Sequence, residues 1–213
     1  MRVGIVGAGF SASFHLRSYQ QVQNVPVEIR AIASRTRARA EQLAGRYGVP
    51  TVYDDHRPLL EDPSISVVDL CVPNALHLPL VLEAAKAGKH VICEKPLTGY
   101  FGRGEPDPAV GATPKRAMLD KVRADLAEVT RVMAEHPVKF CYAENWVYAP
   151  AVRKALEILE RYVVAGSILE IRGEESHSGS HSEYSKWWRY AGGGSLARMA
   201  AHPIGLGLFL KNF

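Results

Sequence analysis

Cysteine is scarce in this sequence: Cys71, Cys93 and Cys141 are the three cysteines in 213 residues. They lie far apart inside apolar segments, which excludes a disulfide-rich scaffold, and we expect reduced core thiols in a cytoplasmic protein. Long hydrophobic runs are also missing. No stretch approaches the roughly 20 apolar residues of a transmembrane helix, and no signal peptide precedes the first predicted strand. We therefore expect no membrane partner.

The chain has little excess charge of either sign. The net charge is +4, from 26 Lys and Arg against 22 Asp and Glu. A nucleic-acid-binding surface would show a dense basic stripe interleaved with aromatic residues, and none is present. We expect no nucleic-acid partner. Apolar residues make up 47% of the chain, which is typical of a globular protein. Its 213 residues are enough for one large domain, or for one domain and part of another.

A glycine-rich turn follows the first apolar segment, residues 3–6. The pattern G-x-G-x-x-A stands between this predicted strand and a predicted helix over residues 13–21, which is the setting of a dinucleotide-binding turn. Gly7 permits the tight turn, Gly9 lets the backbone approach a pyrophosphate, and Ala12 lets the helix pack on the strand. Free N–H groups at the helix N-terminus suit phosphates. The residues assigned here to cofactor binding are Gly7, Gly9, Phe10, Ser11 and Ala12.

The end of the second predicted strand, residues 27–33, indicates which dinucleotide is bound. An Asp or Glu at this point would bond the 2′-hydroxyl of NAD. The chain has Ser34, Arg35 and Thr36 instead, with Arg39 on the same face of the next predicted helix. Hydroxyl and guanidinium groups suit a 2′-phosphate, so NADP is favoured over NAD. The alternative is a solvated basic helix face.

Strand and helix signals alternate over the first two thirds of the chain. This alternation predicts an α/β fold with a doubly wound parallel sheet and right-handed crossovers. The further predicted strands are residues 52–53, 66–72, 90–93 and 138–141, and the further predicted helices are residues 36–47, 56–61, 75–87 and 117–135.

Polar residues follow two of these strands at the edge where open α/β sheets bind ligands. Pro73, Asn74 and His77 come after the strand 66–72, and Glu94 and Lys95 after the strand 90–93. Asn74 could bond a ribose or carboxamide, whereas His77 could instead line the start of its helix. For Lys95 the alternative is a strand-end lysine that reaches water.

Together these motifs resemble the glucose-fructose oxidoreductase / inositol dehydrogenase (Gfo/Idh/MocA) family. The matching motifs are Gly7-Ala8-Gly9 with His15, Pro73-Asn74 with His77, residues 87–91, and Glu94-Lys95-Pro96-Leu97. The resemblance is close over residues 1–97 and looser from about residue 127. It implies an NAD(P)-dependent oxidoreductase acting on a sugar, polyol or related small molecule. It also implies that Lys95 lies beside the nicotinamide and the reacting oxygen, as a catalytic residue.

The resemblance further implies a Rossmann domain at residues 1–142 and part of an open-sheet α+β domain at residues 143–213, with a strand begun at 168–173. Residues 98–117 depart from the family pattern as a Gly/Pro-rich insertion, for which a lid, a surface loop and a partner contact stay open. Because relatives are much longer, we expect a fragment truncated at its C-terminus. We also expect a homo-oligomer.

A second landmark is the segment Gly192-Gly193-Gly194 followed by Arg198 and His202. Relatives carry Asp and His at the last two positions, which a helix would place on one face towards the substrate. His202 is therefore expected to act as general base or acid, and Arg198 in place of Asp could anchor an anionic substrate. Asn145 and Trp188 are further candidates for substrate contact.

A metal site is not expected. His177 and His181 have a spacing that serves a metal only on a helix, and the Ser and Gly between them disfavour one. A polar loop near the substrate is the preferred interpretation. Two functions stay open for the chain: a hydride-transferring oxidoreductase, or a catalytically weak or inactive nucleotide-binding redox sensor or partner subunit.

Overall fold

A six-stranded parallel sheet forms the centre of the computed structural model, which describes residues 1–161, 166, 168–176, 178 and 183–211. The strand order is β3-β2-β1-β4-β5-β6, the doubly wound order of dinucleotide-binding folds, and the predicted α/β class is confirmed. The strands are β1 (Arg2–Val6), β2 (Glu28–Ala33), β3 (Thr51–Tyr53), β4 (Val67–Leu70), β5 (His90–Glu94) and β6 (Phe140–Ala143).

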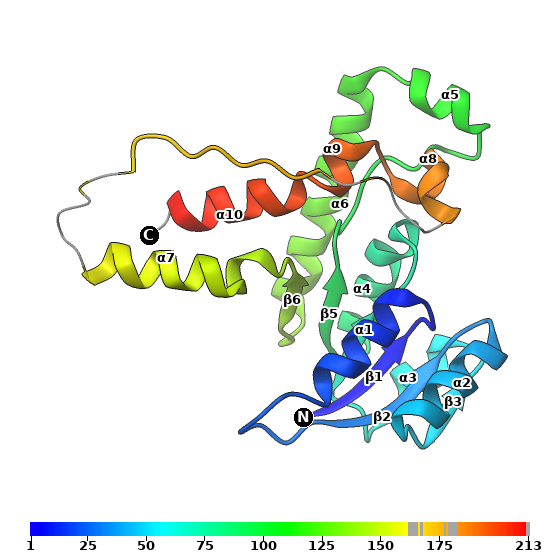
Figure 1. Ribbon diagram of the computed structural model, residues 1–213. Helices are drawn as coiled ribbons and strands as arrows, with labels where there is room; N and C mark the ends of the chain where they lie inside the picture. The colour runs from blue at the N-terminus through cyan, green and yellow to red at the C-terminus, as the bar shows by residue number, and fades with distance from the viewer. Residues whose placement is uncertain (162–165, 167, 177, 179–182, 212–213) are drawn as a thin grey trace.

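Helices cover both faces of the sheet (Figure 1). On one face Leu16 of α1 packs with Ile5 of β1, and on the other Val81 of α4 packs with Val68 of β4. Burial on both faces explains why the strands read as apolar runs. The described α-helices are α1 (Phe10–Tyr19), α2 (Arg37–Tyr47), α3 (His56–Glu61), α4 (His77–Lys86), α5 (Asp107–Ala112), α6 (Lys115–Glu135), α7 (Pro150–Arg161), α8 (Trp188–Ala191), α9 (Ser195–Arg198) and α10 (Ala201–Lys211). None of these described helices is long and apolar enough to cross a membrane.

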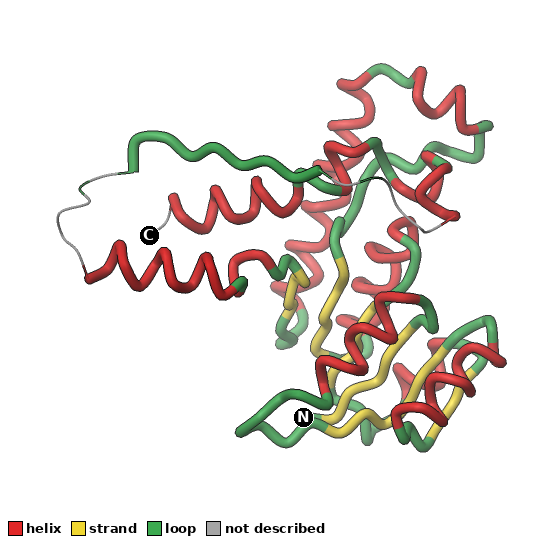
Figure 2. The backbone as a smooth tube through the Cα atoms, viewed as in Figure 1, coloured by secondary structure: helices red, strands yellow, loops and turns green. Residues whose placement is uncertain are grey.

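The strand predicted over residues 168–173 is wrong. This stretch runs as an extended loop above α10 in Figure 2, and Leu169 within it is 95% exposed. An extended segment becomes a strand only where a neighbour supplies hydrogen bonds. No described segment after β6 offers a partner, so the described chain has one sheet. Beyond β6, α7 and α10 instead flank a cleft of about 570 Å³.

Candidate functional site

A cavity of about 730 Å³ opens at the carboxyl ends of β1, β2, β4 and β5. It is the crevice in which open α/β sheets bind ligands. All but one of the residues predicted to bind the cofactor line it. They are Gly7, Gly9, Phe10, Ser11, Ser34, Arg35, Thr36, Arg39, Pro73, Asn74, His77, Glu94 and Lys95. The exception, Ala12, is fully buried and packs α1 on the sheet, which is the role its small size predicts.

The two glycines of the turn serve different purposes. Gly7 has φ +117°, and a Cβ atom on it would overlap the carbonyl oxygen of Cys71. Its N–H donates to the Ala33 carbonyl at 2.8 Å, so the turn is clamped between neighbouring strands. Gly9 has an ordinary φ of −96°, and nothing lies within 4 Å of where its Cβ would be. The fold itself therefore requires Gly7, whereas Gly9 leaves space open in the cavity.

The end of the cavity beside β2 is basic. There, the guanidinium of Arg37 forms ion pairs with Glu41 at 2.7 Å and with Asp54 at 2.9 Å. Arg35 and Arg39 line the cavity and form no ion pair with any residue that the structure describes. Both guanidinium groups therefore remain for an anionic ligand.

At the other end of the cavity, Lys95 emerges from β5. Its backbone N–H donates to its neighbour's carboxylate, Glu94 Oε2, at 3.0 Å. Its ammonium Nζ donates to the backbone carbonyl of Arg198 at 2.7 Å. Asn74 Nδ2 donates to the Ala191 carbonyl at 3.1 Å, so two predicted site residues hold the segment around α8 and α9 over the cavity.

His77 is fully buried, and both of its ring nitrogens face backbone carbonyls. Nδ1 lies 2.6 Å from the oxygen of Pro96 and Nε2 lies 2.9 Å from that of Val72. Burial lowers the pKa of His77. The ring thus ties the chain after β4 to the chain after β5, and it agrees with the structural alternative for this residue.

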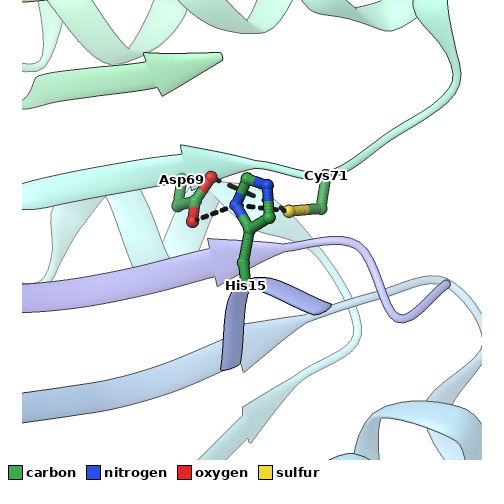
Figure 3. Close-up of side chains that lie close together, drawn as sticks. All are labelled: His15, Asp69 and Cys71. Atoms are coloured by element: carbon green, nitrogen blue, oxygen red, sulfur yellow. Dashed lines mark hydrogen bonds and ion pairs between the residues drawn. The ribbon is translucent and has the colours of Figure 1, made fainter. Parts of the chain in front are cut away.

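A buried charge network adjoins Lys95 through Glu94, and Figure 3 shows three of its members, His15, Asp69 and Cys71. His15 of α1 contacts Asp69 Oδ2 through Nδ1 at 2.8 Å and Glu94 Oε1 through Nε2 at 3.2 Å. Tyr19 donates its hydroxyl to the same Asp69 oxygen at 2.8 Å. Burial alone lowers the pKa of His15, but its bonds to Asp69, Cys71 and Glu94 outweigh that effect and raise the pKa to about 12. An imidazolium therefore bridges two carboxylates, one of them fully buried in β4.

Among the residues that the structure describes, one group has the composition of a metal site. The ligand atoms of His15, Asp69 and Cys71 lie within 4.8 Å of one another. Nδ1 and Oδ2 are at hydrogen-bond distance, however, and burial raises the pKa of Cys71 to about 12, so the thiol stays protonated. A charge-assisted network accounts for the group. The two histidines weighed as ligands, His177 and His181, lie outside the described residues.

His202 does not lie where the sequence placed it. The predicted single helix is two: α9 ends at Arg198 and α10 begins at Ala201. Arg198 lines the cavity, whereas His202 does not; its Nδ1 is hydrogen-bonded to Glu144. The ring also stacks on Trp146, with centroids 5.4 Å apart. The general-base role assigned to His202 has no geometry to support it.

Two further substrate candidates lie away from the cavity. Asn145 is exposed beside the short 3-10 helix η2 (Trp146–Tyr148). Trp188 packs on the insertion 98–117: its indole donates to the Tyr100 carbonyl at 2.9 Å, and its backbone N–H donates to Asp107 Oδ2 at 2.6 Å. The insertion itself contributes no lining residue among those described. The insertion packs against α8, and residues of α8 line the cavity.

The cavity also has lining residues that the sequence did not single out. Tyr184, Ser185 and Tyr190 enter from η4 (Glu183–Lys186) and α8. No local pattern marks them, because they reach the site only through tertiary contact. Asp69 did carry a signal, since it is a charged residue inside the apolar strand Val67–Leu70.

Comparisons with known proteins agree with this geometry. Residues 1–102 match the model of the oxidoreductase family with an NAD-binding Rossmann fold. A levoglucosan dehydrogenase of Pseudarthrobacter phenanthrenivorans is 31% identical over 99% of this chain and 51% of its own. A D-xylose 1-dehydrogenase (NADP(+)) of Haloferax volcanii is 42% identical over 46% of this chain and 30% of its own.

Solved structures give the same result. A levoglucosan dehydrogenase in complex with NADH and levoglucosan superposes with a TM-score of 0.76 at 26% identity, covering 99% of this chain and 53% of that one. The chain thus spans about half the length of the levoglucosan dehydrogenase that it matches. Residues 1–102, which include the glycine turn and the Glu94-Lys95-Pro96 segment, belong to the Gfo/Idh/MocA family of oxidoreductases with an NAD-binding Rossmann fold.

Proposed function

We propose that the protein is an NADP(H)-dependent oxidoreductase that transfers a hydride between the nicotinamide and a sugar, polyol or related small carbonyl compound. The observation that carries this proposal is the position of Lys95, at the opposite end of one cavity from the basic residues Arg35 and Arg39. A dinucleotide is an elongated ligand that requires a phosphate-binding turn in the middle, and Gly7 and Gly9 supply it. The open space at Gly9 fits the pyrophosphate.

Each group has a definite task in this proposal. Arg35, Arg39 and the hydroxyls of Ser34 and Thr36 hold the 2′-phosphate, and Asn74 lies at the nicotinamide end. The nicotinamide, when bound, supplies the hydride donor or acceptor. Lys95 donates a hydrogen bond to the reacting oxygen and stabilises the negative charge that develops on it. Mixing the protein with NADPH and a panel of sugar ketones, and following absorbance at 340 nm, tests the proposal directly.

The two glycines of the turn provide a test of cofactor binding. We expect Gly9→Ala to change the free energy of unfolding by less than about 0.5 kcal/mol, because neither its φ nor its surroundings oppose a methyl group. We expect the same change to weaken dinucleotide binding by at least about tenfold, because the methyl group blocks the backbone from the pyrophosphate. Fluorescence titration with NADPH and urea denaturation measure the two effects.

Gly7→Ala is the matched control for Gly9→Ala. Its Cβ overlaps the Cys71 carbonyl at a positive φ, so the strand ends must separate, and we expect a loss of stability of about 1–3 kcal/mol together with a loss of binding. If Gly9→Ala bound NADPH as tightly as the parent protein, the pyrophosphate could not lie on this turn.

Cofactor preference is a separate expectation. We expect NADPH to bind at least about tenfold more tightly than NADH, because charge-assisted bonds to a 2′-phosphate contribute about 1.5–3 kcal/mol each before desolvation is subtracted. Arg35→Ala is expected to reduce the difference in affinity between NADPH and NADH. Arg37→Ala is the control, because its guanidinium is already engaged by Glu41 and Asp54. Tighter binding of NADH by the parent protein would overturn the preference for NADP.

Two observations favour a second candidate function. Lys95 already donates to the Arg198 carbonyl, and His202 is bound to Glu144 outside the cavity. Both facts suit a nucleotide-binding redox sensor or partner subunit with little turnover. Such a protein would bind NADPH with normal affinity and reduce no sugar ketone.

Three further expectations belong to this proposal. We place the end of the cofactor domain at residue 142, within β6 (Phe140–Ala143), with the insertion 98–117 inside that domain. The protein is proposed to act as a homo-oligomer. Its cysteines are proposed to be reduced, as in the cytoplasm.

A further inference from the structure

The end of the cavity around Lys95 carries an excess of positive charge. Lys95 and the guanidinium-bearing Arg198 both line it. Glu94 is the one carboxylate that lines this end among the described residues. The other two acidic residues of the cavity, Asp54 and Asp55, follow β3 at the basic end and form ion pairs with arginines there.

Glu94 does not neutralise Lys95 and Arg198, because both of its carboxylate oxygens already have hydrogen-bond partners. One of its oxygens faces the ring of His15 at 3.2 Å, and the other accepts the backbone N–H of Lys95 at 3.0 Å. The imidazolium of His15 thus lies between Glu94 and Asp69 as their shared counterion. The net charge that faces a ligand at this end of the cavity is therefore positive.

Arg198 is the less satisfied of the two cations. Its side chain is half-buried and forms no hydrogen bond or ion pair with a residue in the described ranges. Burial lowers the pKa of Arg198. A partly desolvated guanidinium without a carboxylate partner raises the free energy of the ligand-free protein, and binding of an anionic ligand offsets this desolvation penalty.

We propose that this end of the cavity takes a substrate with a carboxylate group, a sugar acid, whose carboxylate is bound by Arg198 while a carbinol or carbonyl oxygen meets Lys95. Tyr184 and Tyr190 also line this cavity, and their phenol groups suit the remaining hydroxyls of a sugar. A guanidinium holds a carboxylate by two parallel bonds, which fixes the orientation of the ring. This inference rests on the proposed function and names its substrate class.

The carboxylate takes no part in the redox step. In oxidation, the carbinol C–H bond breaks, its hydride passes to NADP⁺, and the hydroxyl proton is released to solvent; the products are a keto acid, NADPH and H⁺. Arg198 therefore contributes the same binding energy to the ground state and to the transition state. Its removal is expected to raise KM and to leave kcat nearly unchanged.

The test compares neutral sugars with their own acids, in binding and in turnover. Calorimetry of the NADPH-loaded protein is performed with glucose against glucuronate and gluconate, and with galactose against galacturonate. At least one acid is expected to bind about 10- to 100-fold more tightly than its neutral partner, the range for one charge-assisted pair. Arg198→Ala is expected to abolish that difference and Arg198→Lys to restore part of it. Arg161→Ala, an exposed arginine of α7, is the control for loss of charge.

The outcomes separate this inference from the proposed function. If no acid exceeds its neutral partner, or if Arg198→Ala leaves the difference intact, the acid-binding inference is wrong, and turnover of a neutral sugar would still support the oxidoreductase. If the protein fails to bind NADPH, the proposed function fails first. If acids bind through Arg198 without turnover, the substrate class stands and the sensor function takes precedence.

Discussion

Replacement of Lys95 by alanine is expected to lower turnover by about 10²–10³-fold, the range for removing one donor to a developing oxyanion. The bond from Lys95 strengthens as the reacting oxygen gains negative charge, so it acts mainly on the transition state. Affinity for NADPH is expected to stay within about twofold, because the phosphates lie on the glycine turn. Steady-state turnover and cofactor titration of the same preparation measure the two effects.

Lys86 offers a matched control, because it is an exposed lysine in the last turn of α4. Lys86→Ala is expected to change neither quantity. Near-normal turnover of Lys95→Ala on an identified substrate would show that Lys95 is only a strand-end lysine. If the parent protein binds NADPH tightly and reduces nothing, the sensor function replaces the oxidoreductase, and the contact between Lys95 and the Arg198 carbonyl becomes its structural basis.

The cofactor half of the site could be predicted from the sequence because its signals are local. A turn clamped between two strands requires Gly7 at a positive φ, and that requirement is visible in six consecutive residues. The same holds for Asn74 and Lys95, which follow apolar strands by one to four residues. In a parallel sheet every such strand end reaches the same edge, so strand order alone brings these residues together.

The substrate half could not be predicted because it depends on contacts between distant segments. Trp188 contacts the insertion through Tyr100 and Asp107, more than 80 residues earlier in the chain. The break between α9 and α10, which separates Arg198 from His202, is the exception, because Pro203 in the first turn of α10 marks it locally. The role of His15 was missed for a different reason: His15 lies on α1, its partners Asp69 and Glu94 lie on β4 and β5, and only the fold shows that they converge.

Replacement of His15 by glutamine is expected to lower the free energy of unfolding by about 3–5 kcal/mol, the range for removing one partner of a buried ion pair. The change leaves Asp69, which is fully buried in β4, without its counterion. His15→Gln combined with Asp69→Asn is expected to be less harmful than His15→Gln alone, because the fully buried carboxylate of Asp69 is then replaced by a neutral amide. His56→Gln is the surface control: its bond to Glu83 is more exposed, and we expect at most about 1 kcal/mol. Urea denaturation at pH 7 gives all three values.

The pH dependence tests whether the folded protein keeps a proton on the His15–Asp69 pair, as a charged His15 requires. Its pKa is raised from 6.5 to about 12, so its contribution to stability is fully present below pH 6.5 and decreases as the pH rises towards 12. The pKa of Glu94 is lowered, so its contribution to stability stays constant at any pH above the usual pKa range of a glutamate. Between pH 6.5 and 9 the parent protein should therefore lose its advantage over the His15→Gln/Asp69→Asn variant, by at most about 1.4 kcal/mol per pH unit. Parallel stability curves for these two proteins would mean that the folded protein keeps no proton on this pair, so that His15 is neutral while Asp69 is ionised.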